Sequence, residues 1–190
     1  MPEPNIRTLS VGLLGTCCYM LSLPGRDDCV VIDPGAEPDV IRQAAEGRAI
    51  AAVLLTHGHF DHIGAVAELL TPDAALVIHE LDAPLLGDPQ LNASWLIGQS
   101  VTAPDATHPV HEGDEITYAG ITFTVLHTPG HTPGGVCYRT GNSLFSGDTR
   151  FRFGFGRTDL PGGNMRDLQR SLARLAPLLE EVTLYPGHEA

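Results

Sequence analysis

The segment Thr56-His57-Gly58-His59-Phe60-Asp61-His62 decides how the rest of this sequence is interpreted. It places three imidazoles and one carboxylate directly after the apolar run 51–55, which predicts a buried strand. Side chains at the end of a strand stand on a rigid edge, where a preorganised site can be built. We expect His57 and His59 to point to one side and bind a metal ion. Asp61 and His62, at the start of a following helix, would reach a second ion.

Three further segments share one design, in which a residue of a metal-ligand type stands beside a glycine at the end of an apolar strand. They are Gly130-His131-Thr132, Ser146-Gly147-Asp148 and Pro186-Gly187-His188. Any one of them alone is weak evidence, because a lone His or Asp after a strand is usually structural. Together they supply one histidine for each of two ions and an aspartate that can bridge them. A polar loop with incidental histidines is the less favoured interpretation.

The hydrophobic pattern along the chain predicts strands mixed with helices. Strands are expected at 6–15, 18–23, 29–32, 51–55, 76–78, 115–118, 121–126, 136–140, 143–146 and 182–185, and helices at 38–47, 63–70, 80–86 and 165–179. Residues 87–110 are expected to form a long irregular loop. The turns Ala119-Gly120 and Gly141-Asn142 predict hairpins, which require antiparallel pairs. Two sheets with helices outside therefore fit better than a doubly wound parallel sheet.

Composition and charge limit the class of protein. The 190 residues, 43% hydrophobic and 18% charged, are expected to form a single domain, 1–190. The N-terminus has no signal-peptide pattern and residues 11–25 are too interrupted to span a bilayer, so a cytoplasmic protein with four reduced, buried cysteines is expected. The formal net charge is −12 and the 11 basic residues are all arginine. Nucleic acid and anionic membranes are therefore poor candidate partners.

With these residues together, the sequence resembles the metallo-β-lactamase superfamily, specifically its small bacterial glyoxalase II-like hydrolases. The resemblance runs from the turn Asp33-Pro34-Gly35 to the C-terminal histidine segment. It implies an α+β fold, a four-layer αββα sandwich of two mixed β-sheets flanked by helices. Asp33 matches a position that orients ligands without binding metal. The ligands implied are His57, His59 and His131 for the first ion, Asp61, His62 and His188 for the second, and Asp148 as the bridge.

The metals imply the mechanism. Two divalent ions about 3.5–4 Å apart can share a hydroxide, and zinc lowers the pKa of bound water to about 7. Zinc is expected here, with iron or manganese as alternatives. The bridging hydroxide would attack a small thioester or ester, and Asp61 is taken as a catalytic carboxylate as well as a ligand. Two +2 ions with Asp61, Asp148 and a hydroxide leave a charge of +1, which would accept an anionic substrate.

Several other residues are assigned more general roles. Arg157 and Arg150 are predicted substrate contacts, with Arg157 favoured because Gly156-Arg157-Thr158-Asp159 resembles a recurrent family segment; exposed loop arginines, Arg152 included, are the alternative. Trp95, with Leu91, Leu96 and Ile97, either lines a substrate mouth or packs in the core. The remaining histidines, His79, His108, His111 and His127, are expected to be structural or exposed.

Several alternatives remain open. Full-length glyoxalase II carries a glutathione-binding helical domain that is not expected in a chain ending soon after His188, which puts lactoylglutathione in doubt as substrate. Asp148 makes the sequence look unlike a true β-lactamase. The main rival is a persulfide dioxygenase of the same superfamily, with one Fe(II) at positions matching His57, His131 and Asp148. The segments 61–65 and 185–188 favour the hydrolase. A nuclease is less favoured, as is a non-catalytic metal-binding module.

Overall fold

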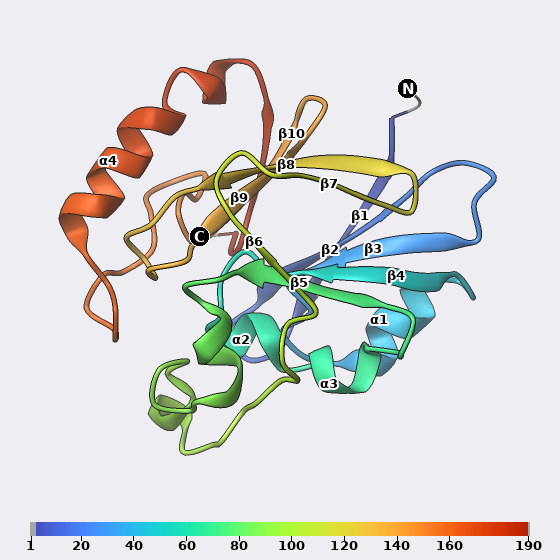
Figure 1. Cartoon of the computed structure of the whole chain (residues 1–190), viewed down its shortest axis with the longest axis horizontal. Helices are drawn as coiled ribbons and strands as arrows, with labels where there is room; N and C mark the ends of the chain where they lie inside the picture. The colour runs from blue at the N-terminus through green and yellow to red at the C-terminus, as the bar shows by residue number, and fades with distance from the viewer. Residues whose placement is uncertain (1–2, 190) are drawn as a thin grey trace.

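Two β-sheets pack face to face in the computed structural model, which describes residues 3–189 (Figure 1). The first sheet has the order β1-β2-β3-β4-β5-β6, and the second has the order β11-β10-β9-β8-β7. Their bounds are β1 Asn5–Val11, β2 Thr16–Ser22, β3 Asp28–Ile32, β4 Ala49–Leu54, β5 Ala75–His79, β6 His108–Val110, β7 Glu115–Tyr118, β8 Ile121–His127, β9 Val136–Thr140, β10 Ser143–Gly147 and β11 Thr183–Pro186.

Both sheets are mixed, as expected from the sequence. In the first, β1, β2 and β3 are antiparallel neighbours and β3 to β6 are parallel. In the second, β7 to β10 are antiparallel and β10 pairs with β11 in parallel. The two predicted hairpins are confirmed: Tyr118 pairs with Ile121, and Thr140 pairs with Ser143. This connectivity brings strands from the two halves of the chain into a single sandwich.

The continuous apolar runs of the central strands follow from burial on both faces. In β3, Val30 and Ile32 point into the core between the sheets, whereas Cys29 and Val31 pack under the outer helices. β4 follows the same alternation, so a strand with both faces covered needs apolar residues throughout. The rigid end of β4, where the histidine segment begins, is therefore anchored from both sides.

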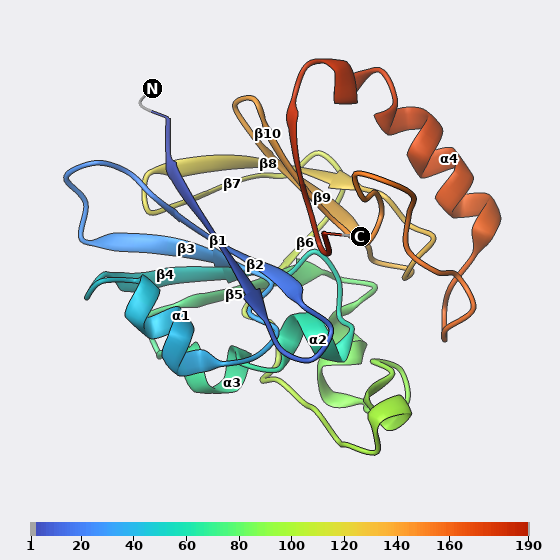
Figure 2. The same ribbon diagram turned by 180° about the vertical axis from the view of Figure 1, so that it is seen from behind.

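Helices cover the outer faces of the sandwich (Figure 2). On the first sheet lie α1 (Pro38–Ala44), α2 (Phe60–Ile63) and α3 (Val66–Leu69), and on the second lie α4 (Met165–Leu175) and the 3₁₀ turn η3 (Leu178–Glu180). Asn164 caps α4 by accepting hydrogen bonds from the backbone N–H groups of Arg166 and Asp167. The four-layer αββα sandwich predicted from the resemblance is thus confirmed.

Several predicted bounds were wrong for local reasons. The expected strand 6–15 ends at Val11, because Gly12 and Gly15 adopt positive φ angles of 70° and 62° in the turn to β2. The expected helix 63–70 is two short helices, because the N–H of Ala65 bonds to the carbonyl of Pro34 between them. The helices expected at 38–47 and 165–179 end earlier, the second just before Pro177.

The central segment holds more structure than the sequence indicated. The helix expected at 80–86 is a 3₁₀ turn, η1 (Ala83–Gly87), and the expected loop 87–110 contains η2 (Ser94–Ile97) and the edge strand β6. β6 contains Pro109, which hides a strand from pattern analysis although an edge strand tolerates it. All four cysteines are free and buried, as predicted. Within residues 3–189, no helix is long and apolar enough to cross a membrane.

Candidate metal centre

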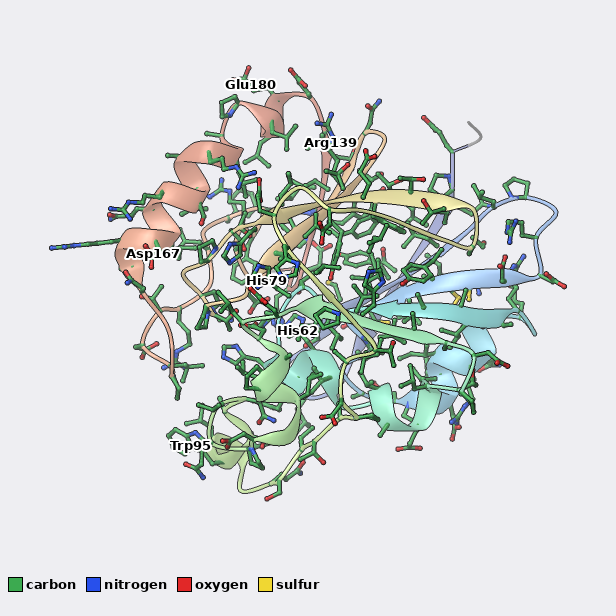
Figure 3. The ribbon with its side chains drawn as sticks, in the orientation of Figure 1. His62, His79, Trp95, Arg139, Asp167 and Glu180 are labelled. Atoms are coloured by element: carbon green, nitrogen blue, oxygen red, sulfur yellow. The ribbon has the colours of Figure 1, made fainter. Side chains whose placement is uncertain are left out.

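The seven predicted ligand side chains meet at one edge of the sandwich, where four strands end. His57 and His59 follow β4, and Asp61 and His62 lie in α2. His131 lies between β8 and β9, Asp148 directly follows β10, and His188 follows β11 after Gly187. His62 lies deep in this cluster, whereas Trp95 stands out on the peripheral η2 turn (Figure 3). The chain thus assembles the cluster from both of its sheets.

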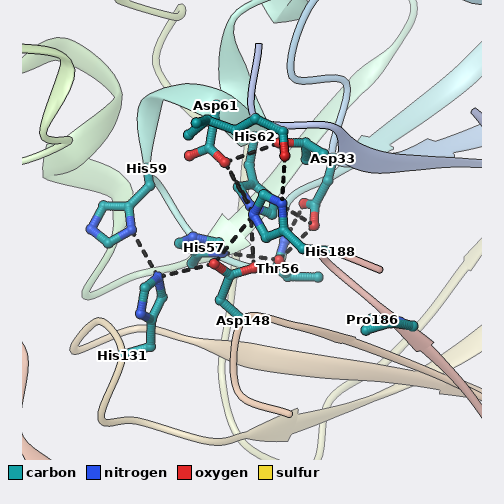
Figure 4. A network of polar contacts seen from close by, with 12 residues as sticks. Asp33, Thr56, His57, His59, Asp61, His62, His131, Asp148, Pro186 and His188 are labelled. Carbon is teal, nitrogen blue, oxygen red and sulfur yellow. Dashed lines mark hydrogen bonds and ion pairs between the residues drawn. The ribbon is translucent and has the colours of Figure 1, made fainter. Parts of the chain in front are cut away.

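The cluster divides into overlapping groups that fit metal ions. Donor atoms lie within 4.8 Å of one another in each of three sets: His57, His59 and His131; His57, His62 and Asp148; and Asp61, His62 and His188. The carboxylate of Asp148 stands between the outer sets, with Oδ1 3.3 Å from His62 Nε2 and Oδ2 3.5 Å from both His131 Nε2 and His188 Nε2 (Figure 4). This is the arrangement expected for two ions and a bridge.

Two of the glycines in the repeated design are required for space. A Cβ atom on Gly147 would lie 2.3 Å from Thr56 Oγ1, and Gly147 has a φ of 49°. A Cβ atom on Gly187 would lie 2.2 Å from Asp148 Oδ1. Glycine at these positions lets β10 and β11 end against the histidine segment. The glycine-plus-ligand pattern in the sequence therefore has a steric cause.

Four of the histidines turn one ring nitrogen outward to a fixed partner. His62 Nδ1 donates to Asp33 Oδ2 at 3.0 Å. His131 Nδ1 donates to the carbonyl of Arg157 at 2.7 Å, and His188 Nδ1 to that of Leu14 at 3.2 Å. The hydroxyl of Thr56 donates to Asp33 Oδ2 at 2.6 Å and accepts from His57 Nδ1 at 3.1 Å. These contacts keep the proton on Nδ1, so Nε2 is the ring atom that faces the cluster and can bind a metal ion once it is deprotonated.

Several inward atoms have nothing to bond to. Within the part of the chain that the structure describes, five buried side-chain polar atoms have no hydrogen-bond partner. Four belong to residues of the cluster: His57 Nε2, His59 Nε2, His62 Nε2 and Asp148 Oδ1. His59 Nε2 does not face the cluster, because the Nδ1 atom of the same ring faces His131. An unsatisfied buried polar atom costs about 1–3 kcal/mol, so the other three favour a cation site here. The donor set, imidazoles with carboxylates, suits Zn²⁺ or Fe²⁺, and the residues fit a metal centre.

The electrostatics also favour metal binding. Burial lowers the pKa of His57 well below its usual value, and burial with the neighbouring His131 lowers the pKa of His59 to about 3. Burial raises the pKa of Asp148, but His62 and His188 outweigh it and hold that pKa well below the usual value. In Asp61 the same two histidines lower the pKa to about 2 against burial. Neutral imidazoles and ionised carboxylates are the forms that bind metal, and these four side chains have them. In His62 and His188 burial is outweighed by the carboxylates of Asp61 and Asp148, which hold the pKa of His62 well above its usual value and raise the pKa of His188 to about 9. A metal ion would therefore displace a proton from each of these two rings.

Asp33 has the orienting role predicted for it. Its Oδ1 accepts from the backbone N–H of Thr56 at 2.8 Å, and its Oδ2 holds both the Thr56 hydroxyl and His62. Its own position at the end of β3 is strained, with a φ of 52°. Asp33 thereby supports one histidine directly and His57 through Thr56, without itself pointing into the cluster (Figure 4).

Sequence reasoning missed two supporting residues. Thr16 donates to Asp61 Oδ2 at 2.9 Å. Asp82, fully buried, accepts from the N–H of Gly58 at 3.0 Å, the hydroxyl of Thr132 at 2.7 Å and the N–H of Gly134 at 2.6 Å. Asp82 thus ties the loop of His57 and His59 to the loop of His131. A lone aspartate between a strand and a proline does not indicate this role in the sequence. The only signal is that the metal ligands have glycine and threonine neighbours, whose N–H and hydroxyl groups can donate to a shared acceptor.

A pocket of about 260 Å³, the metal pocket, lies over the cluster. It is lined by Leu14, His59, Phe60, Asp61, Ala93, Leu96, Ile97, His131, Asp148, Arg157, Leu160 and His188. The predicted mouth residues Leu96 and Ile97 are therefore in place, while Trp95 and Leu91 are not part of its lining. Because apolar side chains complete the wall around the ligands, the pocket suits a small organic molecule.

The two predicted substrate arginines, Arg157 and Arg150, differ in where they lie. Arg157 lines the pocket, but its guanidinium forms a two-point ion pair with Asp159 at 2.6 and 2.7 Å. Arg150 Nη1 donates to the carbonyl of Gly154 at 3.2 Å and does not line the pocket, and Arg152 pairs with Glu189 at 3.2 Å. Arg157 thus contributes its backbone carbonyl to His131, and its side chain is committed to a carboxylate of the chain itself.

The other histidines lie outside the cluster, as predicted. His79 stacks on His127 with ring centroids 4.0 Å apart, and His111 lies beside them and pairs with Glu80 at 3.0 Å. His127 Nε2 donates to the carbonyl of Pro133 at 2.9 Å. His108 is exposed on β6. These residues form none of the groups that bring three donor atoms together among the described residues.

The fold and this centre define a class of αββα proteins with a histidine and aspartate metal site between their sheet ends. The family model described as the metallo-beta-lactamase superfamily matches residues 11–188, and the chain belongs to that superfamily. Metal-dependent hydrolases are found among its relatives. It is 36% identical over 189 residues to the probable metallo-hydrolase YqgX of Bacillus subtilis, covering 96% of this chain and 89% of the relative.

Other similar proteins differ in how much of their own length the chain covers. The chain is 37% identical over 174 residues to a hydroxyacylglutathione hydrolase of Aeromonas hydrophila, covering 90% of this chain but 61% of that protein. Among solved structures, the BLEG-1 B3 metallo-beta-lactamase superposes with a TM-score of 0.90 at 35% identity, covering 97% of this chain and 91% of that one. TTHA1623 in a di-iron-bound form gives 0.84 at 38% identity, covering 96% and 91%.

Proposed function

We propose that the chain is a binuclear metal-dependent hydrolase of small thioesters or esters, acting as an intracellular enzyme. The observation that carries the proposal is the carboxylate of Asp148, which contacts His131 of the first donor set as well as His62 and His188 of the second. A single ion would leave one of the two donor sets without a partner. Two divalent ions, when bound, would polarise a substrate carbonyl and lower the pKa of a water molecule.

The chain's own residues would place and confine the reaction. Asp61 lines the metal pocket and is fixed by Thr16, so its ionised carboxylate can orient an attacking water by accepting a hydrogen bond. Leu14, Phe60 and Leu96 limit bulk water around the carbonyl. Among the described residues that line the pocket, none outside the ligand set is an acid that could protonate a leaving amine. A thiol, with a pKa of about 8.5, leaves as its anion, which favours a thioester over an amide.

The similar proteins support a thioester substrate and also indicate the alternative functions to test. A hydroxyacylglutathione hydrolase is among the similar proteins. The similarity to the BLEG-1 B3 metallo-beta-lactamase makes a β-lactam the second substrate to test, although the sequence alone argued against it. The mononuclear iron dioxygenase also remains: His131 Nε2 lies 3.5 Å from Asp148 Oδ2, on the side of His57, and the chain is 30% identical to ETHE1 from Myxococcus xanthus.

The decisive experiment counts metal ions in protein purified without added metal and then assays a panel of thioesters, esters and one β-lactam. We expect about two ions per chain and hydrolysis of the thioesters. His57→Ala and His59→Ala should each lower kcat/KM more than about a hundredfold, while His108→Ala, an exposed histidine outside the centre, should not. Full activity in both ligand variants would reject the proposal. One iron per chain with oxygen uptake on glutathione persulfide would establish the dioxygenase instead.

A further inference from the structure

A second pocket opens beside the metal pocket and has no part in the function proposed so far. This side pocket has a volume of about 460 Å³, within the range of roughly 300–1,000 Å³ common for ligand sites. The β1–β2 turn, the loop before α1, α2 and the segment after η2 enclose it. Leu14, Phe60, Asp61 and Ile97 line both pockets, so the two pockets adjoin.

The wall of the side pocket is mainly apolar. Besides the shared residues, Leu13, Ala36 and Val101 contribute to it. Leu13 is 95% exposed, although it stands at a turn held in place by the bond from the N–H of Gly12 to Glu37 Oε2 at 2.9 Å. Large apolar side chains grouped around a concave surface indicate a binding site rather than chance exposure.

The charges of the side pocket exclude one kind of ligand. Besides the shared Asp61, its described lining residues include two carboxylates, Glu37 and Glu68, and no arginine. The one arginine that lines the adjoining metal pocket, Arg157, is already paired with Asp159. An anionic group would therefore meet repulsion in the side pocket, where none of the described lining residues is basic. This argues against the anionic substrate that the net charge of the metal centre suggested.

We propose that the side pocket binds an uncharged aliphatic chain of the substrate while the ester or thioester carbonyl lies over the metal centre. The inference rests on the proposed hydrolase function and adds its substrate class. The shared wall at Asp61 and Phe60 carries it, because a chain attached to a carbonyl above Asp61 would reach the side pocket past the apolar side chains of Phe60 and Leu14. The chain belongs either to the acyl part or to the thiol part of the substrate.

Two series of neutral thioesters test the proposal on the metal-loaded protein. One varies the acyl group on N-acetylcysteamine from acetyl to octanoyl, and the other varies the thiol on an acetyl group from ethanethiol to octanethiol. We expect kcat/KM to rise about two- to fourfold for each added methylene in one series, and that series identifies which part occupies the pocket. A flat or falling profile in both series would overturn the proposal.

A variant pair locates the effect. The chain-length ratio is kcat/KM for the longest substrate divided by kcat/KM for the shortest. Leu13→Asp should lower this ratio at least about tenfold. Leu81→Asp, at a leucine that is 49% exposed and outside both pockets, should not change it. Calorimetry with the unreactive thioether N-acetyl-S-octylcysteamine gives a readout that needs no catalysis. Binding should be tighter than that of the S-ethyl compound and weakened by Leu13→Asp.

The outcomes separate the two proposals. Absence of hydrolysis of every ester and thioester would refute the hydrolase, whatever the thioether shows. Hydrolysis without chain-length dependence, or with a dependence that Leu13→Asp leaves intact, would refute the side pocket alone. A dimer that Leu13→Asp dissociates without changing the chain-length ratio would show that a second copy of the chain covers Leu13, and would also refute it.

Discussion

The paired use of ring nitrogens explains how single residues build the centre. His62, His131 and His188 each give Nδ1 to an oxygen that can only accept, which leaves Nε2 as the ring atom that faces the cluster. His59 is the exception, since its Nδ1 faces His131 Nε2 at 2.9 Å. The sequence could predict which residues gather but not which nitrogen each presents, because Leu14 and Arg157 act through backbone carbonyls that any residue would supply.

Asp148 is expected to control both metal sites together. Its two oxygens face different histidines, so Asp148→Ala should weaken the binding of both ions by at least about tenfold. Metal content measured at limiting free metal checks this. Asp39→Ala removes a carboxylate that is 94% exposed on α1 and should leave the content unchanged. Loss of one ion with full retention of the other would show that Asp148 is not a bridge.

His79 is expected to make the fold sensitive to acid. Burial, with His127 and His111 nearby, lowers the pKa of His79 to about 4, below the ordinary value of 6.5. As the pH falls, the unfolded chain binds this proton first, so stability that is complete above pH 6.5 is lost progressively down to about pH 4. The ring accepts a hydrogen bond from the N–H of Leu81 at Nδ1, which protonation would abolish.

His79→Phe keeps a ring to stack on His127 but cannot titrate. The free energy of unfolding of the wild type, relative to this variant, should therefore fall by about 2 kcal/mol between pH 7 and pH 5. Urea denaturation of both proteins at the two pH values measures it. A difference that stays constant with pH would mean that His79 titrates as it does in the unfolded chain.

At the scale of elements, strand ends were predictable because two independent patterns coincide there. A buried apolar run indicates β4 and β10, and an alternation of buried apolar residues with threonine indicates β8; the polar residues that follow these strands must lie at the sheet edge. The short helices were less predictable. The boundary between α2 and α3 depends on the bond from Ala65 to the carbonyl of Pro34, which is a contact between segments that no local pattern records.

Asp82 joins the loop of His57 and His59 to the loop of His131 and is expected to stabilise the position of one loop against the other. Asp82→Asn replaces an acceptor with an amide N–H facing other donors, so the free energy of unfolding should fall by about 2–4 kcal/mol. Asp88→Asn provides the control, since Asp88 accepts from Gln90 and Leu91 within one exposed loop and should cost less than about 1 kcal/mol. Equal losses in the free energy of unfolding for the two variants would show that Asp82 does not hold the two loops together.

At the scale of the whole molecule, the metal centre is also a connection between the sheets. The first sheet supplies His57 and His59 after β4, and the second supplies Asp148 and His188 after β10 and β11. The layered architecture followed from the sequence because hairpin turns and the family motif agree. The side pocket could not be predicted from the sequence. Its wall combines segments near residues 12, 36, 60 and 99, which come together only in the folded chain.

Since ligands come from both sheets, metal binding should stabilise the whole fold. A ligand that binds only the native state adds about 4 kcal/mol at a free concentration of 1,000 times its Kd, which for a chain of this size corresponds to a rise in Tm of about 8–16 °C. Removal of metal with a chelator should lower the Tm by this amount, and added Zn²⁺ should restore it. His131→Ala should lose at least half of the rise, because it removes a ligand of the second sheet, whereas His108→Ala should keep it in full. If the chelated and metal-loaded proteins unfold at the same temperature, the orphaned atoms of His57, His62 and Asp148 have a role other than holding the two sheets to a shared pair of ions.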